Sequence, residues 1–331
     1  MKILITGGLG FIGSHIVKSL TEKRYEVVIY DNFSTGLREN LDGINSDKIE
    51  LIEGDILDYN KLHTAMHGVD IVSHHAAQLE IFVGIDEPEK DLSVNTVGTL
   101  NVLKAAKNNN VQKVVNASSA CIYGQTDKEK NENDPTNPNW AYGVSKLAAE
   151  KYANIYSKYK SLPVTNLRYG IVYGEHEWYR RVLPIFIKKV ILGENPVVFG
   201  NGNQIRDFIY VGDAVELHNK CLFDEAANGE TFNVGTGEPT TIIELADTAC
   251  KIVEEDLQVI FEDLQEGQFS SLVQGKKRNV DELGVMLLNI DKAKNILQWE
   301  PKIPLSEGME KEYHWAKNHL YRWDRIQSTK W

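Results

Sequence analysis

The sequence predicts an α/β fold in which a doubly wound parallel sheet is joined to a smaller, mixed α/β C-terminal part. Three observations carry this prediction. Short β-rich runs alternate with helical stretches through the first half of the chain, several of these runs lack a polar alternate face, and a glycine-rich turn follows the first run. Strands without a polar face are typical of parallel sheets that helices cover on both sides.

The expected elements follow one another in βαβ order. The strand-like runs are Lys2–Thr6, Glu26–Tyr30, Ile49–Glu53, Asp70–Ser73, Lys113–Ala117 and Val164–Arg168. Apolar residues at helical spacing predict helices over Gly13–Thr21, Val94–Lys107 and Tyr142–Lys158. This alternation is the pattern of a doubly wound sheet.

The regular alternation fades after about residue 170, where the segment 174–202 becomes richer in Trp, Tyr, Arg and Pro. A chain of 331 residues is long for one domain, given about 150 residues per domain. We therefore predict a first domain over 1–170, with about 207–235 interleaved, and a smaller second domain over 171–206 and 236–331.

Composition excludes several classes of partner. The formal net charge of -11 disfavours nonspecific binding to nucleic acid or to an anionic membrane. Three cysteines at wide spacing are typical of free thiols in a reducing compartment. The chain enters its first strand at once, without a signal-peptide pattern, and holds no apolar run of membrane-spanning length. We expect a cytoplasmic protein.

The glycine-rich turn has the form GxxGxxG, with Gly7, Gly10 and Gly13 around Phe11 and Ile12. Glycines at these points permit a tight turn and close approach to a pyrophosphate, which the helix N-terminus then binds. Asp31 lies at the end of the second strand, where a carboxylate accepts bonds from the adenosine ribose and repels a 2′-phosphate. The first domain is therefore predicted to be a Rossmann domain that binds NAD rather than NADP.

A second motif predicts acid–base chemistry. Tyr142 and Lys146 form a YxxxK pair, whose spacing places both side chains on one face of a helix. Ser119 lies just past a predicted strand and completes a Ser-Tyr-Lys set. A phenol has a pKa of about 10, so a base near pH 7 needs about 4 kcal/mol of preferential phenolate stabilisation. A neighbouring ammonium and the positive nicotinamide ring have the right sign.

These motifs together resemble the extended short-chain dehydrogenase/reductases, and within them the NAD-dependent sugar-nucleotide epimerase/dehydratase family. The site residues are most similar to those of UDP-glucose 4-epimerases. The resemblance runs nearly end to end and rests on Gly7–Gly13, Asp31-Asn32, Gly54–Ile56, His74–Ala77, Asn95, Gly98-Thr99, Ser119, Tyr142, Lys146, Arg206–Val211 and Trp299–Pro301.

The resemblance implies roles for residues that spacing alone does not assign. In the cofactor site, Asp55 and Ile56 would meet the adenine, with Asn32 beside Asp31, and Ala76 and Ala77 would line the nicotinamide side. Asn95 would belong to the same site, and Lys146 would bond the nicotinamide ribose. In the second, substrate-binding domain, Arg206 and Arg278 would contact the diphosphate of a nucleotide-linked sugar, UDP by default, while Ser119 and Tyr142 would meet the sugar.

The same resemblance implies a homodimer, in which the helices over 94–107 and 142–158 pair into a four-helix bundle.

The sequence departs from the family pattern at two places. Ile171 lies where relatives commonly carry an amide donor to the phosphate, so phosphate contacts must be redistributed. The segment Glu175–Arg181 is unusual; it either brings aromatic and cationic groups to the substrate or forms a surface loop before a basic helix start.

The two residues after Ser119 predict the type of reaction. Related dehydratases carry an Asp-Glu pair at the positions of Ala120 and Cys121, and related decarboxylases carry Glu at the position of Cys121. The chain is therefore expected to be a 4-epimerase that works through a transient 4-keto sugar. Dehydratase, decarboxylase and 4-ketoreductase activities are the alternatives, and an idle NAD-binding regulator is disfavoured by the intact Ser-Tyr-Lys set.

Other polar motifs are assigned no chemistry. His63 and His67 have metal-ligand spacing, but the sequence around them offers neither a third ligand nor a general base, so we predict no metal site. His74 and His75 fall at a strand end, where packing and orientation are their expected roles. Cys121 is expected to be a buried thiol lining the pocket rather than a nucleophile.

Overall fold

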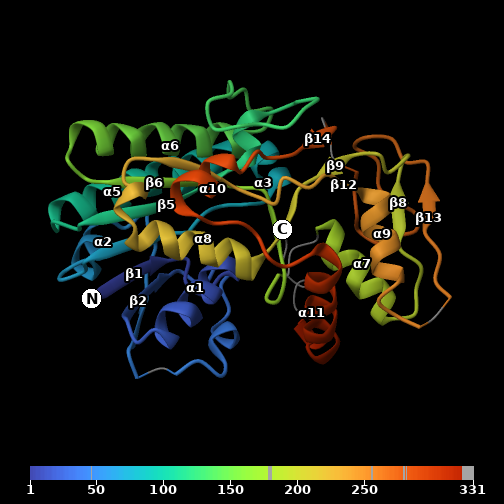
Figure 1. Cartoon of the computed structure of the whole chain (residues 1–331), viewed down its shortest axis with the longest axis horizontal. Helices are drawn as coiled ribbons and strands as arrows, with labels where there is room; N and C mark the ends of the chain where they lie inside the picture. The colour runs from blue at the N-terminus through green and yellow to red at the C-terminus, as the bar shows by residue number, and fades with distance from the viewer. Residues whose placement is uncertain (46, 178–180, 255, 279, 281, 323–331) are drawn as a thin grey trace.

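A seven-stranded parallel sheet forms the larger part of the computed structural model, which describes residues 1–45, 47–177, 181–254, 256–278, 280 and 282–322. The strands lie in the order β11-β6-β5-β4-β1-β2-β3 (Figure 1). They are β1 (Lys2–Thr6), β2 (Glu26–Asp31), β3 (Ile49–Glu53), β4 (Ile71–His74), β5 (Lys113–Ser119), β6 (Val164–Tyr169) and β11 (Thr231–Val234). The order reverses between β1 and β4, so their carboxyl ends border the crevice where α/β sheets bind ligands.

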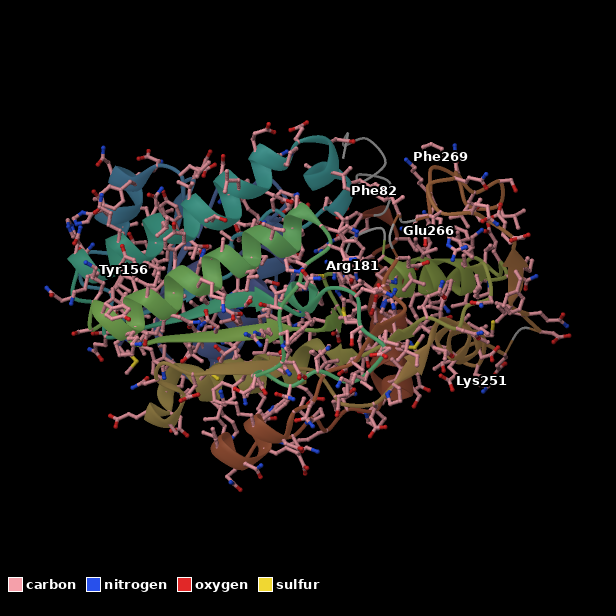
Figure 2. All side chains as sticks on the ribbon, turned by 90° about the horizontal axis from the view of Figure 1, so that it is seen from above. Phe82, Tyr156, Arg181, Lys251, Glu266 and Phe269 are labelled. Atoms are coloured by element: carbon pink, nitrogen blue, oxygen red, sulfur yellow. The ribbon has the colours of Figure 1, made fainter. Side chains whose placement is uncertain are left out.

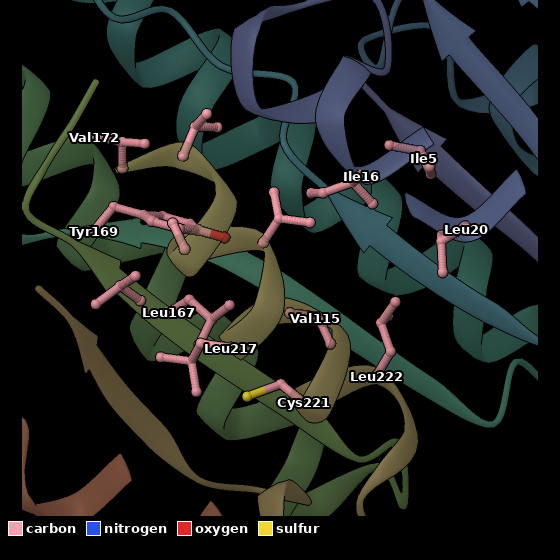
Figure 3. Close-up of a cluster of buried hydrophobic side chains, with 14 of the residues drawn as sticks. Ile5, Ile16, Leu20, Val115, Leu167, Tyr169, Val172, Leu217, Cys221 and Leu222 are labelled. Atoms are coloured by element: carbon pink, nitrogen blue, oxygen red, sulfur yellow. The ribbon is translucent and has the colours of Figure 1, made fainter. Parts of the chain in front are cut away.

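Helices cover both faces of this sheet. One layer holds α1 (Phe11–Glu22), α8 (Val211–Phe223) and α10 (Asp291–Leu297), and the other holds α2 (Tyr59–Ala65), α5 (Thr99–Asn108) and α6 (Ala141–Tyr159). In β1, Ile3 and Ile5 face the first layer while Leu4 faces the second, and all three are fully buried. Figure 3 shows the first layer, where Ile16 and Leu20 of α1 lie near Ile5. Burial on both faces explains the absence of polar alternation.

The predicted fold class is confirmed, with two local differences. The strand Thr231–Val234 was not predicted as a seventh strand, because its four alternating residues are too short a run to stand out and include a buried asparagine. The predicted helix over 94–107 is divided, since Leu92–Gly98 forms a π-helical segment that leads into α5. Apolar spacing does not distinguish a π-helical turn from an α-helical one.

The smaller part of the molecule is built mainly from the C-terminal half of the chain. It combines three small sheets with helices α7 (Val182–Ile191), α9 (Ile242–Cys250) and α11 (Leu305–Asn318). The sheets pair β7 (Ile171–Tyr173) with β10 (Phe208–Tyr210), β8 (Val197–Phe199) with β13 (Ile260–Glu262), and β9 (Ile205–Arg206) with β12 (Thr240–Thr241) and β14 (Val285–Met286). A separate apolar core joins α7, α9 and α11.

Short helices connect these parts: η1 (Arg38–Leu41), α3 (Ile81–Asp86), α4 (Pro88–Asp91), η3 (Ala120–Tyr123) and η4 (Glu225–Ala227). Ile290 and Trp299, on either side of α10, pack into the core beneath the large sheet, so the chain returns to the larger part late in the sequence. The predicted domain boundaries stay a prediction. Within the described ranges, no helix is both long and apolar enough to cross a membrane.

Candidate active site

The glycine-rich turn between β1 and α1 is closely packed. Gly7 has φ +69°, and a Cβ there would lie 2.7 Å from the backbone nitrogen of Ala76, while a Cβ at Gly13 would lie 2.1 Å from the Gly7 carbonyl oxygen. Among the described residues, no side chain caps α1 after Gly10, and its first turn, with Phe11 and Ile12, holds no acidic residue. The first N–H groups of the helix therefore suit an anion, as a dinucleotide pyrophosphate requires.

Asp31 is buried at the end of β2, next to this turn. Its Oδ2 accepts a hydrogen bond from the Leu9 N–H at 3.0 Å, and its Oδ1 accepts one from the Phe33 N–H at 2.9 Å. Burial raises the pKa of Asp31, whereas these two bonds lower it. Each carboxylate oxygen keeps a lone pair for a ribose hydroxyl, so the geometry fits the predicted role.

The predicted adenine-binding residues lie at the end of the neighbouring strand β3. Asn32 Nδ2 donates to Asp55 Oδ2 at 3.0 Å, and the Tyr30 hydroxyl donates to the Asp55 carbonyl at 2.9 Å. Asn101 of α5 holds the Ile56 carbonyl at 3.0 Å. The loop that carries Asp55 and the buried Ile56 is thus hydrogen-bonded to both β2 and α5. These bonds fix the position of the loop beside Asp31.

Replacing Asp31 by alanine should raise the Kd for NAD by about ten- to a hundredfold, because the ribose loses its acceptor. Discrimination against NADP should relax in the same variant, since the charge that repels the 2′-phosphate is gone. Calorimetric titration with both dinucleotides measures the two effects. Asp31→Asn, which removes the charge and keeps one of the two acceptor oxygens, is the control and should change the NADP affinity more than the NAD affinity. An unchanged ratio of the two affinities would contradict the role of Asp31.

His74, at the end of β4, positions the loop predicted to line the nicotinamide. The Thr99 hydroxyl donates to the Asn95 carbonyl at 2.6 Å and so accepts from His74 Nε2, 2.9 Å away. His74 Nδ1 therefore accepts from the Thr6 hydroxyl at 2.7 Å, and that oxygen accepts the Ala76 N–H at 3.2 Å. Burial lowers the pKa of His74 to about 3. The ring is a neutral bridge, which agrees with an orienting role.

Asn95, in the π-helical segment, joins the same loop to α6. Its Oδ1 accepts the Gln78 N–H at 2.8 Å, and its Nδ2 donates to the Ser145 hydroxyl at 3.0 Å. Ala77 lies between the two tethered positions Ala76 and Gln78 and is half-buried. The loop is therefore fixed at both ends of its nicotinamide-side residues.

A second buried histidine makes the stability of the fold sensitive to acid. Ser73 Oγ lies 2.9 Å from His218 Nε2 and 3.1 Å from His75 Nδ1, and burial lowers the pKa of His218 to about 4. In the unfolded chain a histidine has a pKa of about 6.5, so between these values only the unfolded state takes up the proton. The contribution of a neutral His218 is therefore complete at pH 7 and is lost as the pH falls.

His218→Gln should reduce the loss of unfolding free energy between pH 7 and pH 5 by about 2 kcal/mol. The variant should also be less stable than the wild type at pH 7, because it loses its bond to Ser73. Chemical denaturation at the two pH values, at one fixed NAD concentration, measures both quantities. An equal pH dependence in variant and wild type would mean that His218 does not carry this linkage.

The Ser-Tyr-Lys residues come together where β5 ends and α6 begins. Tyr142 lies in the first turn of α6, with Lys146 one turn later, and the Lys146 ammonium donates to the Ala117 carbonyl. Ser119 ends β5 and hydrogen-bonds the Tyr142 phenol. Burial lowers the pKa of Lys146 to about 8, although the charge of Glu150 raises it.

The surroundings of Tyr142 oppose its ionisation in the free protein. Burial raises its pKa, and the neighbouring Cys121 raises it further, whereas the Ser119 hydroxyl and the charge of Arg181 lower it. Burial also raises the pKa of Cys121 itself, so the thiol is neutral, although the residue is partly exposed and not fully buried as predicted. Additional positive charge is needed for the phenol to act as a base near neutral pH.

Glu150, one turn beyond Lys146, anchors α6 to the sheet and was missed in the sequence. Arg168 of β6 donates to both carboxylate oxygens, at 2.6 and 3.0 Å, and Ser118 of β5 donates at 2.6 Å. The Glu150 side chain is fully buried. Its spacing in the sequence could have identified Glu150, because Tyr142, Lys146 and Glu150 lie along one helix face at four-residue intervals.

The two arginines predicted at the substrate diphosphate lie close together, although 71 residues separate them. Glu282 bridges them, with its carboxylate 3.8 Å from an Arg206 nitrogen and 3.3 Å from Nε of Arg278. Burial lowers the pKa of Arg206, while the charge of Glu282 raises it. Cys121 lies within electrostatic range of both Arg206 and Tyr142, so the arginine pair lies near the Ser-Tyr-Lys residues.

The unusual segment after β7 faces inward in part. Glu175 accepts the Tyr210 hydroxyl at 2.8 Å, and the buried Glu177 lies 4.0 Å from Arg181. Arg181 is the residue directly before α7, so the helix does begin after a basic residue. Figure 2 shows Arg181 between the large sheet and the C-terminal elements. Trp178–Arg180, which belong to the same prediction, lie outside the described residues.

Metal-binding side chains do not gather anywhere in the part of the chain that the structure describes, where no three His, Cys, Asp or Glu residues could hold one ion. His63 and His67 stack edge to face with ring centroids 5.3 Å apart.

The comparison with protein families agrees with this geometry. The family model of the NAD dependent epimerase/dehydratase family matches residues 3–235. The chain belongs to this family. The family is NAD-dependent, in agreement with the predicted cofactor.

Relatives within the family differ in reaction. The chain is 35% identical to a putative UDP-glucose 4-epimerase of Methanocaldococcus jannaschii, covering 96% of this chain and 99% of that protein. It is 31% identical to the dTDP-D-glucose 4,6-dehydratase of Homo sapiens, covering 99% and 93%. It is also 30% identical to a UDP-N-acetyl-alpha-D-glucosaminuronate decarboxylase of Bacillus cytotoxicus, covering 96% and 98%. Because these three sequence identities are so similar, they do not distinguish between the epimerase, dehydratase and decarboxylase reactions.

Solved structures match the fold over its whole length. A UDP-glucose 4-epimerase of Thermotoga maritima with UDP-glucose is 31% identical and has a TM-score of 0.86, covering 97% of this chain and 100% of that one. The NAD complex of a Thermus thermophilus UDP-glucose 4-epimerase is 31% identical and has a TM-score of 0.83, covering 95% and 98%. This member of the family is therefore similar throughout to nucleotide-sugar enzymes.

Proposed function

We propose that this protein interconverts the C4 epimers of a nucleoside-diphosphate sugar, UDP-glucose and UDP-galactose being the first substrates to test. Tyr142 takes the proton of the sugar C4 hydroxyl, and Ser119 orients that hydroxyl. NAD, when bound, would supply the acceptor for the C4 hydride, so the sugar would pass through a transient 4-keto form. Lys146 contributes positive charge that favours the phenolate and bonds the nicotinamide ribose.

The observation that carries this proposal is the pair of residues after Ser119. Elimination of water needs an added acid and base beside the keto sugar. Ala120 is buried and has no proton to transfer, and burial raises the pKa of the Cys121 thiol, which keeps it neutral. Oxidation and re-reduction at C4 need only Ser119, Tyr142 and Lys146, so epimerisation requires the least machinery.

A product panel tests the proposal. The purified protein is incubated with UDP-, dTDP-, GDP- and CDP-linked sugars without added cofactor, and the products are resolved by NMR. We expect a mixture of C4 epimers from one nucleotide class, with NAD released only on denaturation, because the cofactor is regenerated in each cycle. A 4-keto-6-deoxy product would indicate a dehydratase instead of an epimerase. A pentose product would indicate a decarboxylase. Activity that needs added NADH would favour a 4-ketoreductase.

Arg206→Ala should raise the KM for the nucleotide sugar by about ten- to a hundredfold and leave bound NAD unchanged, because a charge-assisted bond to the diphosphate is lost. The sugar must rotate, so most of the binding energy has to come from the nucleotide and its phosphates. Steady-state kinetics and a cofactor release assay measure the two effects. Loss of NAD or of the fold, with an unchanged KM, would make Arg206 structural.

We also propose that the protein is a homodimer formed through the π-helical segment and α6. Apolar side chains are exposed along these elements: Leu92, Val97, Val144, Ile155 and Tyr159 have exposed fractions of 43% or more. A second copy of the same face would bury them. Val144→Glu combined with Ile155→Glu should convert a dimer to a monomer in sedimentation analysis. Sedimentation of the wild-type protein as a monomer would contradict the proposed homodimer.

A further inference from the structure

Glu282 occupies an unusual place for a carboxylate, because it lies between the two arginines assigned to an anionic substrate. One of its oxygens accepts from Arg278 Nε at 3.3 Å and from Gln204 Nε2 at 3.0 Å, and the other lies 3.8 Å from Arg206. The side chains of Arg206, Arg278 and Glu282 are 11, 18 and 20% exposed, so water screens their charges only in part.

The backbone holds these three side chains in one place. Arg206 lies in β9, and Glu282 precedes β14, which pairs with β9 in parallel register. Figure 1 shows β9 and β14 where the large sheet meets the C-terminal elements. Arg278 packs against Gly200, where an added Cβ would lie 2.8 Å from a guanidinium nitrogen. The negative charge of Glu282 is therefore fixed in the site by the fold. Glu282 is not a surface side chain that lies near the arginines by chance.

The charge of Glu282 affects ligands unequally. Two guanidinium groups and one carboxylate carry a net charge of +1 at this point. A sugar-linked diphosphate has one charge on each phosphoryl group, whereas a free nucleoside diphosphate ends in a phosphate whose second ionisation has a pKa of about 6 and so carries nearly one more negative charge at pH 7. A fixed carboxylate beside the phosphates repels the free nucleotide more strongly.

We propose that Glu282 is a specificity-determining residue, which makes the arginine pair prefer a sugar-linked nucleoside diphosphate over the free nucleoside diphosphate. The inference rests on the proposed function, because it requires the substrate diphosphate at Arg206 and Arg278. In this role Glu282 lowers the affinity of the site for phosphates in general. It lowers the affinity for UDP most, and thereby limits inhibition by nucleotide that has lost its sugar.

Calorimetric titration of the NAD-loaded protein with UDP and with UDP-glucose tests the proposal. Glu282→Gln keeps the shape and the acceptor for Gln204 and Arg278 but removes the charge. We expect it to bind UDP about three- to tenfold more tightly, with a smaller gain for UDP-glucose, and we expect both gains to shrink in high salt. Glu282→Asp keeps the charge and should resemble the wild type.

Glu307→Gln is the matched control, because it removes one glutamate charge from an exposed ion pair with Lys311 on α11. It should leave both affinities unchanged. Equal gains for the two ligands, no gain, or weaker binding in Glu282→Gln would overturn the role of Glu282 if Arg206→Ala still weakens both ligands. If Arg206→Ala changes neither affinity, the diphosphate lies elsewhere, and both the placement of the substrate and the role of Glu282 are wrong.

Discussion

Tyr142→Phe should lose about two to four orders of magnitude in kcat while keeping the fold and bound NAD, because the ring still packs but no longer accepts a proton. Burial raises the pKa of Tyr142 in the free protein, and the Ser119 hydroxyl is among the groups that lower it. The phenol is thus held neutral in the free protein, where Lys146 is already in place, and the positive charge of the bound cofactor would favour the phenolate. Removal of the hydroxyl takes away an interaction that matters in the transition state more than in substrate binding.

Steady-state kinetics on the best nucleotide sugar measure the loss, and the KM should change by much less than kcat. Tyr152→Phe is the matched control, since Tyr152 lies on the same helix and is 39% exposed. It should behave as the wild type. Activity of Tyr142→Phe within a few-fold of the wild type would show that Tyr142 is not the base. Loss of NAD together with activity would point to a structural role of the hydroxyl.

The places in the fold of the candidate cofactor residues could be predicted because these residues are local in sequence. The glycine turn and Asp31 are fixed by the first βαβ unit, whose strands β1 and β2 were predicted to within one residue. The apolar runs of these strands are a consequence of burial on both faces. Ser119 and Tyr142 likewise fall at a strand end and a helix start, which periodicity locates well.

The substrate side depends on contacts between distant segments. Arg206 and Arg278 were assigned by resemblance alone, and the sequence offered no sign that Glu282 lies between them, since β9 and β14 are two-residue strands. Glu177 belongs to a charged segment that is typical of a surface loop, yet its side chain is buried. Short strands and buried charges leave no periodic pattern, so only the folded chain reveals them.

The buried pair of Glu150 and Arg168 has the same character, and its removal should have the largest effect on stability. Burial lowers the pKa of Arg168, but the bonds and charge of Glu150 outweigh this and raise it overall. Arg168 also donates to the Tyr123 hydroxyl at 2.7 Å, so one guanidinium ties α6, β6 and η3 together. Since α6 carries Tyr142 and Lys146, the pair fixes the helix of the candidate base.

Arg168→Ala should therefore lower the free energy of unfolding by about 3–5 kcal/mol, because it leaves the Glu150 carboxylate buried without its partner. Chemical denaturation at a fixed NAD concentration measures the loss. The double variant Arg168→Met with Glu150→Gln removes both charges while keeping most of the volume, and it should lose much less stability than Arg168→Ala. If the double variant is as unstable as Arg168→Ala, packing around the pair matters more than its charge. A loss below about 1 kcal/mol in Arg168→Ala would mean that water reaches Glu150 and replaces the arginine.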